Sequence, residues 1–234
     1  MTHLLYLKLL NLLNHLIINM KTFKFLSIAV LTILLFTDSV KEASPIKLEH
    51  KGYTAYYSKT LHYSVNIEWW DTRARLVCPE SKVPRKDAFA PDPLLPAETD
   101  LMNDYKGSGF DRGHMCPAAD NQCSSELQKE CFYFSNMSPQ YHSLNAGIWK
   151  TLESRTRELA TEFDSVKVWC GSLGSAGKIG TVTIPTHCWK VIFIKKTKVW
   201  EAYLFENTKV QPKDLESKLT PLSKIETITR IKFK

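Results

Sequence analysis

The strongest constraint on the fold is a long amphipathic segment over residues 143–163. Its apolar side chains recur at intervals of four or seven residues, which is the spacing of one helix face. Ser143 suits the N-cap position, since its hydroxyl can accept a hydrogen bond from the first turn. The segment therefore predicts a helix that buries one face, formed by Leu144, Ile148, Leu152, Leu159 and Phe163.

Several runs rich in aromatic and β-branched residues predict strands for this helix to cover. They span residues 62–70, 166–170, 181–184, 189–195 and 199–205, with a short strand expected at 132–134. Residues 45–60 read as an irregular lead-in, 79–109 as a proline-rich loop and 171–180 as a turn. We expect a single α+β domain over residues 44–234, with a mixed, mostly antiparallel sheet flanked by helices.

The amino terminus has the pattern of a secretory signal peptide. Lys21 and Lys24 precede a short apolar run at 25–36, and small residues follow. Residues 1–43 are interpreted as an upstream segment plus this signal, with Met20 a better start than Met1. An uncleaved anchor is the alternative, although twelve residues are short for a bilayer. The expected location is secreted or periplasmic, without stable membrane association after cleavage.

Charge and cysteine content give two further indications. Thirty-one Lys and Arg against 24 Asp and Glu give a net charge of +7, which favours polyanionic partners. Six cysteines in an exported chain predict disulfides, although the sequence does not choose the pairs. Cys116, two residues from His114, is expected to be half of a disulfide, and a nucleophile is the alternative. A zinc site of Cys116, Cys123 and Cys131 lacks the usual short spacing.

The segment Asp111-Arg112-Gly113-His114 could carry phosphate chemistry. If it is a strand end, Arg112 and His114 point to the same side. A guanidinium binds phosphate oxygens through a planar fork, and a neutral imidazole can take a proton from water. The competing interpretation is a surface arginine and a structural histidine.

A second polar set lies on the predicted helix at intervals of four residues: Asn145, Trp149, Glu153 and Arg157. These positions form a slowly drifting stripe beside the apolar face. Alone, the stripe could be a solvated edge. Together with His114, it could hold Mg²⁺, which prefers oxygen ligands and keeps several waters. Asn145 would be the direct ligand, and Glu153 would hold the ion through water.

The stretch from about residue 53 to residue 205 resembles the DNA/RNA non-specific endonuclease family. The close match runs from Asp104 to Glu158. It includes the motif at 111–114, the segment Tyr133-Phe134-Ser135-Asn136-Met137-Ser138-Pro139-Gln140, and the residues Leu144-Asn145, Trp149 and Leu152-Glu153. A later match is Pro185-Thr186-His187 with Trp189-Lys190.

The resemblance implies a ββα-metal (His-Me finger) core and Mg²⁺-dependent cleavage of DNA and RNA to 5′-phosphate ends, with Mn²⁺ or another divalent cation as the alternative. Contacts would go to the phosphate backbone, and a homodimer is left open. By match to family positions, His114 is the general base, Asn145 the direct metal ligand, and Glu153 the residue that positions metal-bound water. The remaining implied site residues are Arg112 and Arg157 as phosphate contacts, Asn136 as a support, and Arg85 as a loosely matched substrate contact.

Two other functions compete with a secreted endonuclease. One is an inactive extracellular nucleic-acid-binding module of the same fold. The other is a hydrolase that uses Cys116 as its nucleophile. Replacing His114 would abolish activity in the endonuclease, whereas replacing Cys116 would do so only in the cysteine hydrolase.

Overall fold

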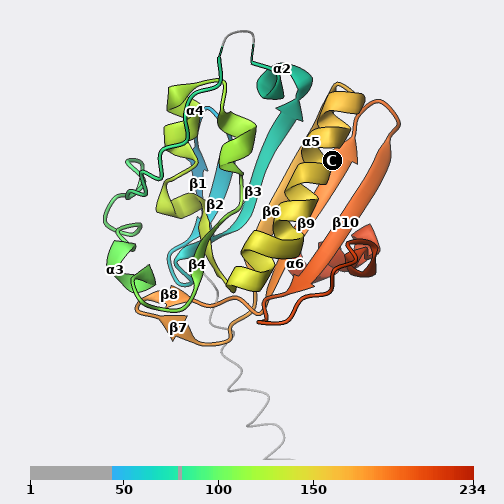
Figure 1. Ribbon diagram of the computed structural model, residues 1–234. Coiled ribbons are helices and arrows are strands. Elements are labelled where there is room, and N and C mark those ends of the chain that lie inside the picture. Colours follow the sequence, from blue (N-terminus) through green and yellow to red (C-terminus); the bar gives the residue numbers. More distant parts are fainter. Residues whose placement is uncertain (1–43, 79–80) are drawn as a thin grey trace, which may run out of the picture. The chain divides into compact units, whose positions relative to one another are not determined.

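A six-stranded antiparallel sheet runs through the domain in the order β1-β2-β3-β6-β9-β10 (Figure 1). The computed structural model describes residues 44–78 and 81–234, so the predictions for residues 1–43 lie outside it. Within the described part, no helix is long and apolar enough to cross a membrane. The strands are β1 (Ile46–Glu49), β2 (Thr54–Ser58), β3 (Tyr63–Thr72), β6 (Ser165–Leu173), β9 (His187–Ile194) and β10 (Val199–Glu206).

Helices cover both faces of this sheet. On one face lies α5 (Lys150–Glu162), which continues from the π-helical turn η3 (Leu144–Trp149). Leu152 and Leu159 of α5 belong to the same buried cluster as Val168 and Ile192 of the sheet, so the predicted apolar stripe faces the core. On the other face, α6 (Leu222–Thr229) buries Ile225 in a cluster with strand residues of β6, β9 and β10.

A smaller antiparallel pair lies beside the helix. It consists of β4 (Asp111–His114) and β5 (Met137–Gln140), with His114 opposite Met137. Between these strands run η1 (Ala118–Asn121), α4 (Ser125–Glu130) and η2 (Phe134–Asn136). The pair and the η3–α5 helix together form the ββα arrangement. The remaining elements are α2 (Arg73–Leu76), α3 (Met102–Tyr105), β7 (Lys178–Ile179), β8 (Val182–Thr183) and η4 (Glu216–Lys218).

The α+β class and the antiparallel sheet are confirmed, but several local predictions are wrong. Residues 45–60 contain β1 and β2; the register shifts between Tyr56 and Tyr57, and this bulge breaks the alternation that marks a strand. Residues 132–134 form no strand, because turn hydrogen bonds from Phe132 and Tyr133 to the end of α4 prevent extension. The 171–180 turn is shorter than expected, since β6 continues to Leu173.

The predicted helix is present but interrupted near its beginning. Gly147 has φ −99° and ψ −117°, which are not helical angles, and η3 is π-helical there. Ser143 occupies the N-cap position but makes no side-chain cap; its hydroxyl instead donates to the carbonyl oxygen of Thr208. A π-helical turn widens the backbone, and such turns are frequent at functional sites.

Candidate active site

A cleft of about 420 Å³ opens between the β4 strand, η1 and the beginning of the α5 helix. Six of the seven predicted site residues line it: Arg85, Arg112, His114, Asn145, Glu153 and Arg157. They come from a loop, a strand and a helix that are distant in sequence. The structure therefore brings together the imidazole, the amide, the carboxylate and three guanidinium groups that the sequence predicted for one site.

His114 occupies the end of β4 between aromatic rings. Its ring centroid lies 5.8 Å from that of Phe89 and 4.9 Å from that of Phe132, the latter edge-on. Within residues 44–78 and 81–234 no hydrogen bond engages the buried Nε2 atom. Burial, followed by the positive charge of Arg85, lowers the pKa of His114 to about 3. The imidazole is therefore neutral at physiological pH, as a proton acceptor must be.

Arg112 and His114 both line the cleft, and the residue between them, Gly113, lies against the side chain of Gln140. A Cβ atom at Gly113 would lie 2.1 Å from Oε1 of the buried Gln140, so a larger residue would force the Gln140 side chain to move. The Arg112 guanidinium stacks over Phe89, with its Cζ 4.8 Å from the ring centroid. This contact holds a cation at the cleft wall without pairing it to a carboxylate.

Asn145 is oriented by the first residue of β4. Its Nδ2 donates to Oδ2 of Asp111 over 2.8 Å, and Nδ1 of His142 lies 2.9 Å from the same oxygen. No hydrogen bond engages Oδ1 of Asn145 in the described part of the chain. Because the amide N–H is fixed on Asp111, the amide oxygen is the atom available as a ligand. A hard divalent cation fits this donor.

Glu153 lies two turns further along α5 on the same cleft. Burial raises the pKa of Glu153 to about 7, against the lowering effect of Lys190 and Arg157. Lys190 is itself buried, with its Nζ 4.4 Å from the centroid of the Trp149 ring. A partly buried carboxylate of this kind gains from a cation that compensates its charge, which fits a metal-holding role.

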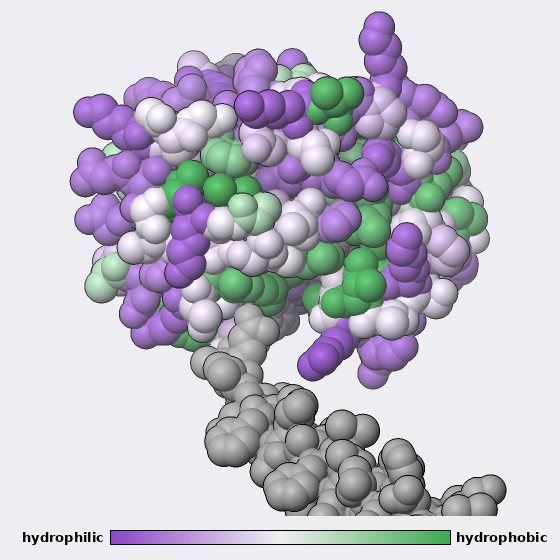
Figure 2. Space-filling view, turned by 90° about the horizontal axis from the view of Figure 1, so that it is seen from below, coloured by the Kyte–Doolittle hydropathy of each residue, from purple (hydrophilic) through white to green (hydrophobic). Residues whose placement is uncertain are grey.

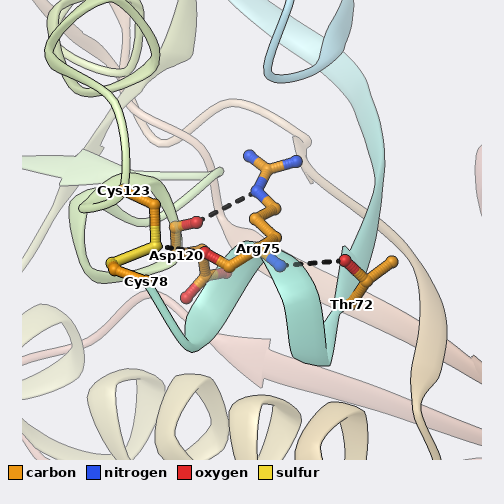
Figure 3. Close-up of a disulfide and its surroundings, with 5 residues drawn as sticks. All are labelled: Thr72, Arg75, Cys78, Asp120 and Cys123. Atoms are coloured by element: carbon orange, nitrogen blue, oxygen red, sulfur yellow. Dashed lines mark hydrogen bonds between the residues drawn. A yellow bond between two sulfur atoms is a disulfide. The ribbon is translucent and has the colours of Figure 1, made fainter. Parts of the chain in front are cut away.

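Arg157 is fixed by an ion pair below the cleft. Its Nη1 lies 3.1 Å from Oδ1 of Asp120, a residue of η1 that is only 1% exposed. The backbone of η1 is held in turn by Arg75, whose Nε donates to the carbonyl oxygen of Asp120 over 3.0 Å (Figure 3). Figure 3 also shows the Cys78–Cys123 disulfide next to Arg75, which links the chain after α2 to the chain after η1.

Asn136 does not line the cleft. It is fully buried, and its Oδ1 accepts a hydrogen bond from the Cys116 N–H while its Nδ2 donates to the carbonyl oxygens of Cys116 and Cys131. These three bonds fasten the turn that directly follows His114. The predicted supporting residue therefore acts on the backbone next to the imidazole.

The cysteine predictions are corrected in part. One disulfide forms, Cys78–Cys123, whereas Cys116, Cys131, Cys170 and Cys188 are free and buried. Cys116 was expected to be half of a disulfide; it instead lies in the core, where Asn121 and Arg75 donate to its sulfur. Burial raises the pKa of Cys116 to about 12, so little thiolate forms at physiological pH, which argues against a nucleophilic role. Zinc binding by Cys116, Cys123 and Cys131 is excluded because Cys123 is in the disulfide.

Two functional contacts were missed from the sequence. Asp111 was treated only as part of a motif, and the structure shows that it orients Asn145. Asp120 was not singled out, although its pairing with Arg157 is among the most buried charge contacts of the site. Asp111 is the first residue of the motif at 111–114, so the sequence did offer a signal for a role of Asp111 in the site. Asp120 offered none, because it meets Arg157 only through tertiary structure.

Comparison with known proteins agrees with this geometry. The family model described as "DNA/RNA non-specific endonuclease" matches residues 38–234. Nuclease EXOG of Xenopus laevis is 41% identical over 123 residues, which cover 46% of this chain and 34% of that protein. Nuclease C1 of Cunninghamella echinulata is 35% identical over 163 residues, covering 60% of this chain and 65% of that protein.

Endonuclease G of Homo sapiens is 34% identical over 148 residues, covering 56% of this chain and 50% of that protein. A crystal structure of the EndoG/EndoGI complex superimposes with a TM-score of 0.72 and 27% identity, covering 82% of this chain and 86% of that one. The matched region spans about a third of the length of the first EXOG relatives.

The fold and the position of the cleft match the ββα-metal core of the endonuclease G structure. The chain belongs to the DNA/RNA non-specific endonuclease family, whose members are metal-dependent nucleases.

Proposed function

We propose that this protein is an endonuclease that hydrolyses phosphodiester bonds of both DNA and RNA in the presence of Mg²⁺ and leaves 5′-phosphate ends. The observation that supports this most directly is the meeting of His114, Asn145 and Glu153 in one cleft with three arginines. Contacts from arginines to phosphate carry no sequence information, which suits a nuclease without sequence preference.

The chain's own residues account for binding and proton transfer. Arg112 and Arg157 bind the phosphate oxygens and stabilise the charge that develops on them. His114, neutral at the working pH, accepts the proton of the attacking water. Asn145 would hold the divalent cation directly through its amide oxygen, and Glu153 would hold it through water. The cation, when bound, supplies positive charge next to the scissile phosphate and the leaving oxygen.

A supercoiled plasmid tests this activity directly. With Mg²⁺ we expect nicked and then linear DNA, fragments that carry 5′-phosphates, and no cutting after a chelator is added. His114→Ala should lower the rate by about 10²- to 10⁴-fold, the usual contribution of a general base. His187→Ala is a matched control, because His187 contacts Thr186 and does not line the cleft.

Four outcomes bear on the proposal and its alternatives. A plasmid that stays intact at every Mg²⁺ concentration contradicts the proposal. Salt-sensitive binding without cleavage would instead identify an inactive binding module. A Cys116→Ser variant should keep full activity, and its inactivity would revive the cysteine hydrolase. RNA cleaved under the same conditions would establish the lack of sugar preference.

We also propose a secreted or periplasmic location. The apolar run at 25–36 and the Cys78–Cys123 disulfide support it, since disulfides persist in oxidising compartments. Several relatives carry "mitochondrial" in their names, so the two locations need to be separated by experiment. Expression of the full chain in cells of its source should place the protein in the medium or periplasm with a new amino terminus. Retention inside the cell with an intact amino terminus would refute this.

A further inference from the structure

A second groove, of about 500 Å³, lies next to the cleft along the same segment of chain. Ala146 and Lys150 line the cleft, whereas Gly147 and Thr151, the next positions along, line the groove. Successive helix positions turn by about 100°, so the two hollows lie on neighbouring faces of the beginning of the helix. The opposite wall of the groove is the loop 209–213, which follows β10.

The groove presents positive charge only. Lys209 and Lys213 line it, and no carboxylate does so among the described residues. The adjacent Asp214 accepts a hydrogen bond from the Glu216 backbone N–H. Lys150 lines the cleft, and the next residue, Thr151, lines the groove. The cationic side chains therefore continue from the cleft to the groove. Two copies of such a surface would repel each other, whereas a polyanion would be attracted.

An aromatic contact connects the two hollows. The Nζ of Lys209 lies 5.9 Å from the ring centroid of Tyr141. Tyr141 in turn packs on Phe110, with 4.5 Å between ring centroids, and Phe110 lines the cleft. Figure 2 views the molecule from the end where α5 begins in Figure 1, and hydrophilic side chains are distributed widely over that face.

The lysine-bearing loop is held in place before any ligand binds. Asn207 donates to the carbonyl oxygens of Pro139 and Pro185. Gln211 donates to the carbonyl oxygens of Glu206 and Thr208. A wall that is already ordered loses less conformational entropy on binding than a free loop does.

We propose that this lysine groove is a second nucleic-acid subsite, which binds backbone phosphates of the substrate strand beyond the phosphate held in the cleft. The proposal rests on the proposed function, since it takes the strand in the cleft to be nucleic acid. A short oligonucleotide fills the cleft alone, and a longer one crosses the helix at Lys150 and reaches Lys209 and Lys213. The groove thus adds affinity that depends on substrate length.

The test compares two double variants in an inactive His114→Ala background. Lys209→Ala/Lys213→Ala removes the charge of the groove, and Lys196→Ala/Lys198→Ala removes the same charge from the exposed turn between β9 and β10. Binding of fluorescent single strands of about three and about twelve nucleotides is measured by anisotropy with Mg²⁺ at several salt concentrations. Unchanged thermal midpoints would show that the variants fold.

We expect the groove variant to bind the long strand about 2- to 30-fold more weakly, as for two exposed ion pairs. Its salt dependence, the slope of log K against log salt, should become shallower by about 1.4. The short strand and the control variant should be unaffected. An unchanged long-strand affinity, an equal loss for the short strand, or an equal loss in the control would each overturn the proposal. Failure of the wild type to cut plasmid would overturn the proposed function instead, because the binding measurement needs no cleavage.

Discussion

The two walls of the cleft are stabilised by different forces. The helix wall, η3 and α5, lies on the six-stranded sheet and is fixed by buried apolar side chains such as Leu152. The wall that carries His114 also has buried apolar side chains, such as Met115 and Phe132, but it depends in addition on polar contacts and one disulfide. Those polar contacts include the bonds of Asn136 and the pair of Asp120 and Arg157. Apolar packing is spread over many contacts, whereas each polar contact acts at one point. Substitutions in the two walls should therefore affect activity differently.

The largest expected effect on stability comes from Asn136→Ala. It leaves three buried backbone groups without partners, at about 1–3 kcal/mol each, so we expect a loss of at least about 3 kcal/mol in the free energy of unfolding. Leu152→Ala, a cavity in the other wall, should cost about 2–5 kcal/mol and serves as the control. Below the melting range, Asn136→Ala should also lose nuclease activity, because the turn after His114 is released. Equal specific activity of the two folded variants would contradict the contrast between the walls.

The disulfide should come next. Cys78 and Cys123 close a loop with a sequence separation of 45 residues, and removal of such a link costs about 2–4 kcal/mol. We expect the Cys78→Ser/Cys123→Ser variant to melt at lower temperature, and a reductant to lower the melting temperature of the wild type only. A reductant that lowers the melting temperature of the variant equally would show that the effect lies elsewhere.

The smallest effect concerns Asp71 of β3, which is fully buried and near Asp120. Burial, followed by the charge of Asp120, raises the pKa of Asp71 well above its usual range. A carboxyl group with a raised pKa binds more protons in the folded state than in the unfolded chain. Stability therefore falls as pH rises from about 4 towards the raised value, by at most about 1.4 kcal/mol per pH unit.

Asp71→Asn should remove this slope. Urea unfolding at about pH 6 and about pH 8 should show a smaller loss of stability for the variant than for the wild type. Parallel pH profiles for the two proteins would show that Asp71 is not protonated in the folded state.

The sequence predicted the helix wall better than the wall that carries His114. The apolar stripe of residues 143–163 and the polar stripe of Asn145, Glu153 and Arg157 both follow from helical periodicity, which survives the irregular turn at Gly147. The motif at 111–114 correctly placed Arg112 and His114 on one side of a strand. Local periodicity is enough where one element carries several site residues.

What the sequence did not predict depends on contacts between distant segments. Asp120 meets Arg157 and Asn136 meets Cys116 only in the folded protein, and neither contact leaves a periodic pattern. The prediction that Cys116 is half of a disulfide failed for the same reason, because an even number of cysteines says nothing about which sulfur atoms approach. Strand β2 was missed because its bulge at Tyr56 and Tyr57 places consecutive residues out of alternation.

The four free cysteines have a practical consequence. All are enclosed in the core, and burial raises the pKa of each thiol, so a thiol-modifying reagent finds almost no thiolate on the native protein. Each becomes reactive only when the surrounding structure opens. Alkylation followed by mass spectrometry would thus report local opening at four interior positions of the protein. Labelling of Cys116 and Cys131 would indicate partial unfolding around those residues, whereas labelling of Cys170 and Cys188 would indicate exposure of the central strands.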